Sequence, residues 1–268
     1  ISLYPAHTEN LYALGLEGSL IGVSPGETHP PRALDKPVFS YRDDPERFLA
    51  ARPDLVLIRP MVFRGHRALV DRLKLAGITV VSLQPNGVEE MFTYWRRLGI
   101  LGGRAPQADA MAASFRQGLE AIRDRWAGVP QEQRPRVYFE AIHSKMKTFA
   151  PDSMGAFVLA AAGGVNVASD AQAVRGTNIA QYGQERILAK GAAIDVYLAQ
   201  VGTMNKVSLE QIKNQSGFGA IKAVATGRVH LVDEEMVSRP TPRLLLGIEA
   251  IHALLYPALT GAPTGGRP

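Results

Sequence analysis

One short pattern occurs twice in this chain and limits the folds that the chain can adopt. The segments DPERFLAARPDLVLI (44–58) and GQERILAKGAAIDVYL (183–198) both carry Glu-Arg-apolar-Leu-Ala in the same order, and an apolar run follows each. One such segment is typical of a helix that leads into a buried strand. Two segments so far apart in the chain predict a molecule built from two halves of similar construction.

The residues around each copy alternate between strand-like and helix-like patterns. In the N-terminal part, apolar runs such as DLVLIRP and ITVVSL alternate with helical stretches such as HRALVDRLKLAG and VEEMFTYWRRLG. The alternation resumes at RVYFEAI and continues to the last helical stretch, TPRLLLGIEAIHALLYP. Alternating strands and helices favour a parallel sheet with helices on both faces.

Between these two regions the pattern predicts one long helix. Apolar residues recur every three or four positions over residues 105–126: Ala108, Met111, Phe115, Leu119, Ile122 and Trp126. Such a helix would be about 33 Å long, enough to run alongside two small domains. We therefore predict an α/β fold of two lobes, each a mostly parallel sheet flanked by helices, joined by one long rigid helix. The predicted boundaries are 1–103 for the N-terminal lobe, 104–127 for the connecting helix and 128–268 for the C-terminal lobe.

Composition limits the class of protein. Hydrophobic residues make up 46% of the chain and charged residues 21%, as in ordinary soluble globular proteins. The richest apolar window, FVLAAAGGV, is far shorter than the roughly 20 residues of a membrane span. The chain has no cysteine, which excludes disulfides and thiolate ligands. A formal net charge of +5 favours anionic partners, but the basic residues are scattered with few aromatic residues among them, so we predict no nucleic-acid binding.

The loops that follow the predicted strands carry the candidate ligand contacts. Open parallel sheets bind ligands beyond the carboxyl ends of their strands, so two joined sheets would hold one ligand in the cleft between the lobes. These loops, including 59–66 and 143–154, place cations beside flat apolar groups, which suits a large anionic ligand with a hydrophobic body. The candidate ligand-binding residues are Tyr4, His7, Arg59, Phe63, Arg64, His143, Lys145, Lys147 and Arg239. For any one of them, a solvated surface charge or a core side chain is the simpler alternative.

Several segments taken together resemble a known family. They are SLYPAHTENLYALG, PERFLAARPDLVLI, LKLAGITVVSL, AAAGGVNVA, QERILAKGAAIDVYL, FGAIKAVATGRVHLVD and SRPTPRLLLGIEAIHALLYP. Their order and spacing are similar to those of class III periplasmic substrate-binding proteins, which deliver ferric siderophores, haem or vitamin B12 to ABC importers. The resemblance spans nearly the whole chain.

The resemblance implies a function and a set of partners. It implies the extracytoplasmic solute-binding component of an ABC importer, capturing a ferric siderophore or haem between its lobes, with a corrinoid such as vitamin B12 as the alternative ligand. Such a protein would be a periplasmic or otherwise extracytoplasmic monomer, and a lipid anchor in a segment preceding this chain is one option. Its partners would be the importer's membrane subunits and a small-molecule metal complex. It would use no cofactor and catalyse no reaction.

The resemblance also assigns a role to the repeated pattern. In this family each lobe presents a surface glutamate near a helix start to arginines of the transporter, and the matching positions are Glu46 and Glu185. A simpler explanation is local, because an acidic residue in the first turn of a helix interacts favourably with the helix dipole. Asp44 and Pro45 already form a typical helix start before Glu46. Equivalent glutamates in both halves favour the docking role.

A bare-metal site is one alternative to a bulky ligand. His7, His66 and His143 lie in predicted loops that could converge with Glu9, as in proteins that capture zinc or manganese directly. Tyr4, His7 or His143 could instead ligate haem iron. The opening SLYPAHTENLYALG resembles the binders of metal complexes, so we predict no metal site formed by the protein alone.

An enzyme is the other alternative. The segment SKMK, from Ser144 to Lys147, fits the Ser-x-x-Lys pattern of acyl-transfer enzymes. The Ser-Asp-Asn and Lys-Thr-Gly segments that accompany this pattern are absent from the sequence. Binding is therefore favoured over catalysis, and no catalytic residue is assigned.

Overall fold

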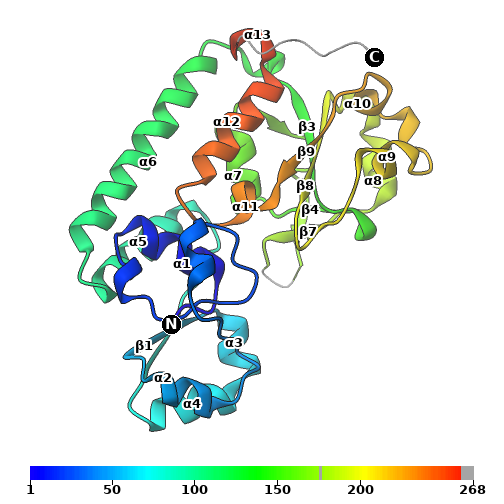
Figure 1. Ribbon diagram of the computed structural model, residues 1–268. Helices are drawn as coiled ribbons and strands as arrows, with labels where there is room; N and C mark the ends of the chain where they lie inside the picture. The colour runs from blue at the N-terminus through cyan, green and yellow to red at the C-terminus, as the bar shows by residue number, and fades with distance from the viewer. Residues whose placement is uncertain (175–176, 261–268) are drawn as a thin grey trace. The chain divides into compact units, whose positions relative to one another are not determined.

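The computed structural model describes residues 1–174 and 177–260, which form two compact units. Unit 1 contains residues 1–85 and 89–113, and unit 2 contains residues 86–88 and the chain from Ser114 onward. The long helix α6 (Ala105–Trp126) has the bounds that its apolar spacing predicts, and it contributes residues to both units. Each unit contains parallel strands flanked by helices, which confirms the predicted α/β class (Figure 1).

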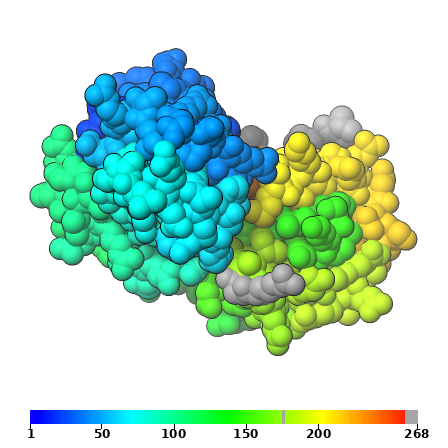
Figure 2. Space-filling model, turned by 90° about the horizontal axis from the view of Figure 1, so that it is seen from below, coloured from blue at the N-terminus to red at the C-terminus, as the bar shows by residue number. Residues whose placement is uncertain are grey.

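The sheet of unit 1 consists of parallel extended segments. Strand β1 (Leu55–Ile58) pairs with β2 (Thr79–Ser82), and its residue Leu57 also bridges Ser2. Val23 bridges Val38 in the same parallel sense. The helices are α1 (Pro5–Ala13), α2 (Pro45–Ala51), α3 (Pro60–Gly65), α4 (Arg67–Leu75) and α5 (Val88–Leu101), with the short turns η1 (Glu17–Ser19) and η2 (Pro31–Asp35). Residues of unit 1 form a continuous surface, coloured blue to cyan in Figure 2.

The local sequence explains where helix α2, which contains the first copy of the repeated pattern, begins and ends. The carboxylate of Asp44 accepts a hydrogen bond from the backbone N–H of Glu46, Pro45 takes the first helical position, and Phe48 is fully buried in the core of unit 1. The helix ends at Arg52, which adopts a left-handed backbone conformation with φ of 47°. The apolar run that follows is buried in β1.

The sheet of unit 2 is larger and mixed. Its order is β6-β7-β4-β3-β8-β9, with β5 also paired to β3. Strands β3, β5, β8 and β9 are parallel, whereas β4, β7 and β6 extend the sheet in antiparallel pairs. The strands are β3 (Arg136–Ile142), β4 (Lys147–Phe149), β5 (Val165–Asn166), β6 (Gln172–Ala173), β7 (Ile179–Gln181), β8 (Val196–Val201) and β9 (Val229–Asp233). Within the described residues, unit 1 has no counterpart of the antiparallel part, so the two halves match in their parallel strands alone.

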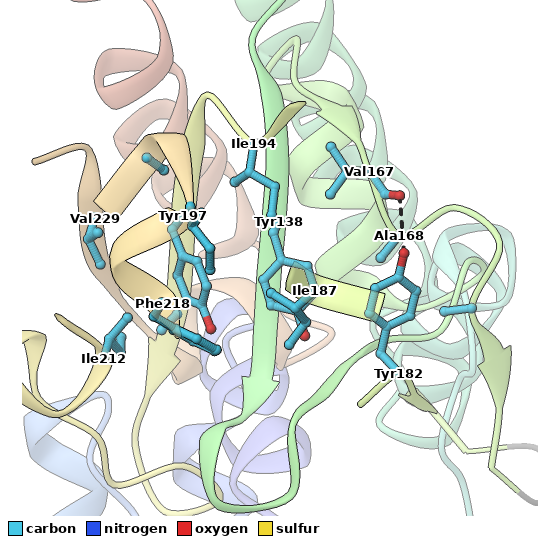
Figure 3. Packing of buried hydrophobic residues seen from close by; sticks show 14 of the residues in the cluster. Tyr138, Val167, Ala168, Tyr182, Ile187, Ile194, Tyr197, Ile212, Phe218 and Val229 are labelled. Carbon is cyan, nitrogen blue, oxygen red and sulfur yellow. Dashed lines mark hydrogen bonds between the residues drawn. The ribbon is translucent and has the colours of Figure 1, made fainter. Parts of the chain in front are cut away.

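Helices cover this sheet on both faces (Figure 1). They are α7 (Met154–Ala161), α8 (Gln184–Ala189), α9 (Leu209–Asn214), α10 (Lys222–Ala225), α11 (Glu234–Ser238), α12 (Leu244–Leu255) and α13 (Pro257–Thr260), with the turns η3 (Gln131–Gln133), η4 (His143–Lys145), η5 (Gly191–Ala193) and η6 (Phe218–Ala220). On one face, the buried rings of Tyr138 and Tyr197 have centroids 5.1 Å apart, and Phe218 packs 5.9 Å from Tyr197 (Figure 3). These aromatic side chains pack β3 and β8 against the helical turn η6.

A buried histidine stabilises the start of unit 1. His7 in α1 is fully buried, and its Nε2 lies 3.3 Å from the carbonyl oxygen of Ile58. Because a carbonyl only accepts, Nε2 carries the proton, and Nδ1 accepts from the hydroxyl of Tyr94 at 2.7 Å. Burial, with a smaller contribution from the charge of Arg59, lowers the pKa of His7 to about 4, although the hydrogen bond to Ile58 opposes this shift.

This burial predicts a stability that falls as the pH falls. The folded protein takes up a proton on His7 only near pH 4, whereas the unfolded chain does so near the ordinary value of 6.5. Between these values the unfolded state binds more protons, so the free energy of unfolding should decrease by up to about 3 kcal/mol on acidification. Urea unfolding of the wild type and of His7→Gln across this range measures the effect. The variant should show the shallower pH dependence, and equal slopes would contradict the assignment.

A close approach between two helices of unit 2 gives a second stability prediction. A Cβ atom on Gly247 in α12 would clash with the carbonyl oxygen of Met236 in α11, and the backbone cannot move aside as a flexible side chain would. Gly247→Ala should therefore lower stability by roughly 1–3 kcal/mol despite the better helix propensity of alanine. Gly219→Ala is the matched control, because nothing lies within 4 Å of its added Cβ. Equal melting temperatures for the two variants would refute the close packing.

Candidate ligand-binding edges and docking helices

The parallel strands of unit 1 end together at what we call the unit 1 edge, defined by Tyr4, Arg59 and Gln84. Tyr4 follows the extended segment 1–3, Arg59 follows β1, and Gln84 lies just beyond β2. The guanidinium carbon of Arg59 lies 4.5 Å from the centroid of the Tyr4 ring, and its Nε donates to Oε1 of Gln84 at 3.0 Å. A cation held over a ring in this way presents a flat, positively charged surface, which suits an anionic ligand with planar parts.

The two candidates that follow Arg59 lie on a helix where the sequence predicted a loop. Pro60 starts α3, a position that suits proline because its missing N–H is not needed there. Phe63 is half-buried against the core of unit 1, with Arg67 at 4.8 Å and Lys74 at 5.4 Å from its ring centroid. Arg64 is exposed. These contacts make Phe63 part of the packing of α3 on α4, whereas Arg64 stays available to a ligand.

The two histidines of unit 1 that the sequence singled out pack against protein side chains, and the ring of His7 lies beneath the unit 1 edge with its centroid 5.1 Å from that of Tyr4. His7 is fully buried with both ring nitrogens bonded to protein atoms, so direct ligand contact by His7 is not supported. His66 packs its ring 4.6 Å from that of Tyr41. Among residues 1–174 and 177–260, no group of three or more histidine, aspartate or glutamate side chains is arranged to hold a metal ion. The bare-metal alternative therefore has no preformed site in that part of the chain.

In unit 2 the strands β3, β8 and β9 end at what we call the unit 2 edge, defined by His143, Lys145, Lys147 and Asn205. The chain leaves β3 through η4, turns at Met146 with φ of 47°, and enters β4 at Lys147. Lys145 is exposed and Lys147 is half-buried, and within the described residues neither ammonium group has an ion-pair partner. Two uncompensated cations on one loop form an electropositive surface at the carboxyl end of β3.

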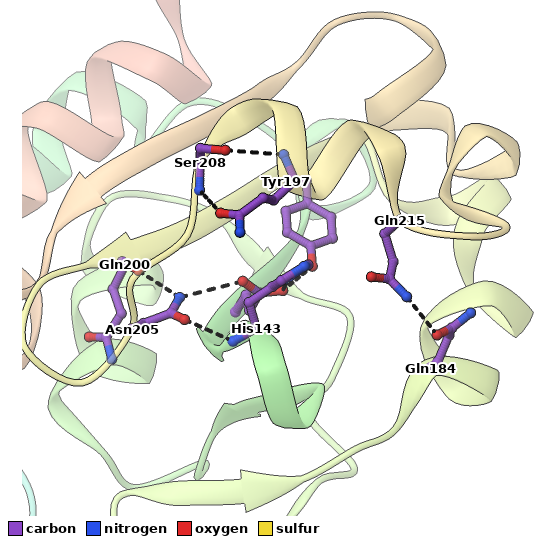
Figure 4. A network of polar contacts seen from close by, with 9 residues as sticks. His143, Gln184, Tyr197, Gln200, Asn205, Ser208 and Gln215 are labelled. Carbon is purple, nitrogen blue, oxygen red and sulfur yellow. Dashed lines mark hydrogen bonds and ion pairs between the residues drawn. The ribbon is translucent and has the colours of Figure 1, made fainter.

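A buried polar network lies beneath His143 (Figure 4). Nδ1 of His143 lies 2.8 Å from Oε2 of Glu140, whose side chain is fully buried and also accepts from the hydroxyl of Tyr197. Burial of Tyr197, together with the charge of Glu140, raises the pKa of this hydroxyl well above its usual value, so it remains a donor. Asn205 accepts from the backbone N–H of His143 at 2.9 Å and donates to the carbonyl of Gln200 at 2.8 Å. The network fixes the position of His143 at the unit 2 edge.

Arg239, the last candidate of unit 2, is held by an ion pair. It follows α11, and its Nη2 lies 2.8 Å from Oε1 of Glu235, with 15% and 19% of the two side chains exposed. Arg243 lies 3.5 Å from the other oxygen of the same carboxylate. Glu235 therefore compensates part of the positive charge that the sequence places after β9. A ligand that contacts Arg239 would therefore bind a guanidinium group that is already paired with the carboxylate of Glu235.

The Ser-x-x-Lys segment does not form one continuous element. Ser144 is exposed in η4, whereas Lys147 lies beyond the left-handed turn at Met146 and belongs to β4. No hydrogen bond joins the hydroxyl of Ser144 to the ammonium group of Lys147 in the described part of the chain. An acyl-transfer nucleophile needs a base within hydrogen-bond reach, and this arrangement does not supply it.

The two predicted docking glutamates occupy corresponding places on exposed helix starts. Glu46 lies in the first turn of α2 with 65% of its side chain exposed, and Arg72 of α4 lies 2.9 Å from its carboxylate. Glu185 lies in the first turn of α8, is exposed, and has no ion-pair partner within the described residues. Its neighbour Arg186 pairs instead with Asp170 at 2.8 Å. Both carboxylates are therefore accessible to a partner, but only Glu46 is paired within its own unit.

Unit 1 also contains a cavity that is separate from the candidate ligand contacts. A cavity of about 460 Å³ in unit 1 lies at the amino ends of the strands, opposite the unit 1 edge, and contains none of the predicted ligand contacts. Its lining combines apolar residues such as Ile1, Leu20 and Leu98 with the charged residues Arg52 and Asp54. In the described chain, no helix combines the length and the apolar character that crossing a bilayer requires.

Sequence reasoning did not find the polar network of unit 2. Glu140 lies within the strand-like run RVYFEAI. The one sequence feature that could have indicated a buried polar network was this single acidic residue in an otherwise apolar strand. Tyr197 belongs to the apolar run of β8, and Asn205 lies in the loop that follows it. Their partnership depends on the parallel pairing of β3 with β8, which places Tyr138 opposite Tyr197 and Glu140 opposite Ala199.

Comparisons with known proteins agree with this architecture. An uncharacterized ABC transporter substrate-binding lipoprotein, YvrC of Bacillus subtilis, is 27% identical over 261 residues, covering 96% of this chain and 79% of that protein. The vitamin B12-binding protein of Yersinia pseudotuberculosis is 27% identical over 255 residues, covering 94% of this chain and 84% of that protein. A crystal structure of a possible iron-binding, periplasmic solute-binding protein from Staphylococcus epidermidis superposes with a TM-score of 0.81 at 26% identity, covering 96% of this chain and 97% of the other.

The family follows from a match over most of the chain. The model of the family described as "Periplasmic binding protein" matches residues 1–236, which include the unit 1 edge, the unit 2 edge and helices α2 and α8. The matched relatives are binding proteins, and the family supports an extracytoplasmic location. This chain belongs to the periplasmic binding protein family.

Proposed function

We propose that this protein is the extracytoplasmic solute-binding component of an ABC importer and that its solute is a bulky metal chelate. A ferric siderophore or haem is the first candidate, and a corrinoid is the second. The two units act as the two lobes of the family, α6 is the connecting helix, and the protein works as a monomer without catalysing a reaction.

One observation carries the proposal. In each unit, cationic and flat side chains gather where parallel strands end: Tyr4 and Arg59 in unit 1, and Lys145 and Lys147 beside His143 in unit 2. A chelate with carboxylate groups and an apolar body matches this combination of charge and flat surface. The names of the relatives support the class of ligand, because one binds vitamin B12 and another is described as possibly iron-binding.

Binding should depend on the uncompensated lysines of the unit 2 edge. The double variant Lys145→Gln/Lys147→Gln should weaken the binding of an anionic chelate by about tenfold or more, because each lysine supplies a charge-assisted contact. Quenching of tryptophan fluorescence, titrated with ferric haem, a ferric siderophore, vitamin B12 and zinc chloride, measures the affinities.

The matched control is Lys213→Gln, which removes an exposed lysine of α9 and should leave binding unchanged. Saturation by zinc with no response to any chelate would overturn the proposed ligand class. Unchanged affinity in the double variant would show that Lys145 and Lys147 do not contribute to ligand binding.

Docking should depend on Glu46 and Glu185 and leave the ligand affinity unaffected. The double variant Glu46→Lys/Glu185→Lys should abolish stimulation of the importer's ATPase, because each substitution reverses a charge that would face arginines on the membrane subunits. ATP hydrolysis by the reconstituted importer, with and without the binding protein, is the measurement. Glu210→Lys is the control, since Glu210 is also exposed in the first turn of a helix, α9. Full stimulation by the double variant would reject the docking assignment.

A further inference from the structure

A fully buried carboxylate in the middle of unit 2 needs an explanation. Glu140 lies on β3 with none of its side chain exposed. Removing an ionised carboxylate from water costs several kcal/mol, and pairing recovers this cost only when the geometry is good. An apolar residue at this position would give the sheet the same packing without that cost. A charged residue at this position therefore points to a task beyond holding β3 in place.

The partners of Glu140 converge on one residue. Its Oε2 lies 2.8 Å from Nδ1 of His143 and accepts from the hydroxyl of Tyr197, and its Oε1 lies 3.5 Å from the side-chain nitrogen of Asn205. Asn205 in turn accepts from the backbone N–H of His143. Side chain and backbone of His143 are thus fixed by the same network, which Gln200 extends by donating to the carbonyl of Ala141 at 3.0 Å.

This arrangement determines which ring nitrogen of His143 is available. An ionised carboxylate only accepts, so Nδ1 carries the proton that it shares with Glu140. In the neutral imidazole the lone pair is then on Nε2. Within the described residues Nε2 has no hydrogen-bond partner, and 13% of the side chain remains exposed at the unit 2 edge. The network therefore presents a Lewis base where a ligand would bind.

We infer that Glu140 is a positioning residue that directs the Nε2 lone pair of His143 to the metal of the bound chelate. This inference rests on the proposed function and narrows its ligand class. The chelate must have an exchangeable coordination position, as ferric haem and aquacobalamin do, because a siderophore that fills all six positions leaves none for His143. One bond forms, between Nε2 and the metal, and one breaks, between the metal and a water molecule. A carboxylate bonded to the other nitrogen is the usual support of a metal-ligating histidine.

The test compares three variants with ferric haem and with aquacobalamin as probes. His143→Ala removes the ligating nitrogen. Glu140→Gln keeps the shape of the side chain, but its amide can rotate and donate to Nδ1, which favours the tautomer with a proton on Nε2. Tyr197→Phe is the matched control, because it removes a hydrogen bond to the same oxygen of Glu140 while leaving the carboxylate next to His143. Absorption spectra report the axial ligand, and titrations report the affinity.

The wild type should bind at least one probe with the spectrum of a nitrogen ligand. His143→Ala should lose that spectrum. The spectrum of Glu140→Gln should shift toward that of His143→Ala, and its affinity for the probe should be about 10- to 100-fold lower than that of the wild type. Tyr197→Phe should keep the wild-type spectrum. If Glu140→Gln fails to fold, Glu140→Asp replaces it, since withdrawing the carboxylate by one methylene should give the same direction of change.

Two results would overturn the inference. One is a wild-type spectrum in His143→Ala or in Glu140→Gln, and the other is binding of a ferric siderophore while neither probe binds. The second result would leave the proposed function intact. Absence of binding to every chelate would instead overturn both.

Discussion

Parallel pairing of strands is the constraint on which the rest of this structure depends. Parallel strands start at one edge of a sheet and end at the other, so residues that follow different strands become neighbours. In unit 1 this brings Arg59 and Gln84 together beside Tyr4. In unit 2 it places the loop after β8, with Asn205, against the start of the loop after β3. Each edge is assembled from segments that are far apart in the sequence.

The two edges differ in how they hold charge. At the unit 1 edge a guanidinium group rests on a tyrosine ring and is oriented by an amide, so its charge is spread over a flat surface. At the unit 2 edge the two lysines are uncompensated, and the histidine is supported from below by a buried carboxylate. The first arrangement suits stacking against the body of a ligand. The second suits the anionic groups of a ligand.

Several predictions from the sequence changed because burial decides the role of a side chain. His7 is in a segment typical of a binding loop, yet α1 begins at Pro5 and turns the imidazole into the core, where Tyr94 and Ile58 occupy both nitrogens. The segment after Arg59 is helix α3 instead of a loop, since Pro60 starts a helix as readily as it forms a turn. The halves also differ more than the repeated pattern indicates, because β4, β7 and β6 extend only the sheet of unit 2.

The sequence by itself determined the α/β class, the long helix α6 and the repeated helix starts that carry Glu46 and Glu185. These features depend on local periodicity and, for α2, on the cap supplied by Asp44, which involve residues close together in the chain. The family resemblance followed from the order of the same segments. Only the tertiary structure decided that His143 is partly exposed at a strand end whereas His7 is fully buried, and that Glu140 lies beneath His143. The reason is that hydrogen bonds between β3, β8 and the loop at Asn205 join residues more than 50 positions apart, and no local pattern records them.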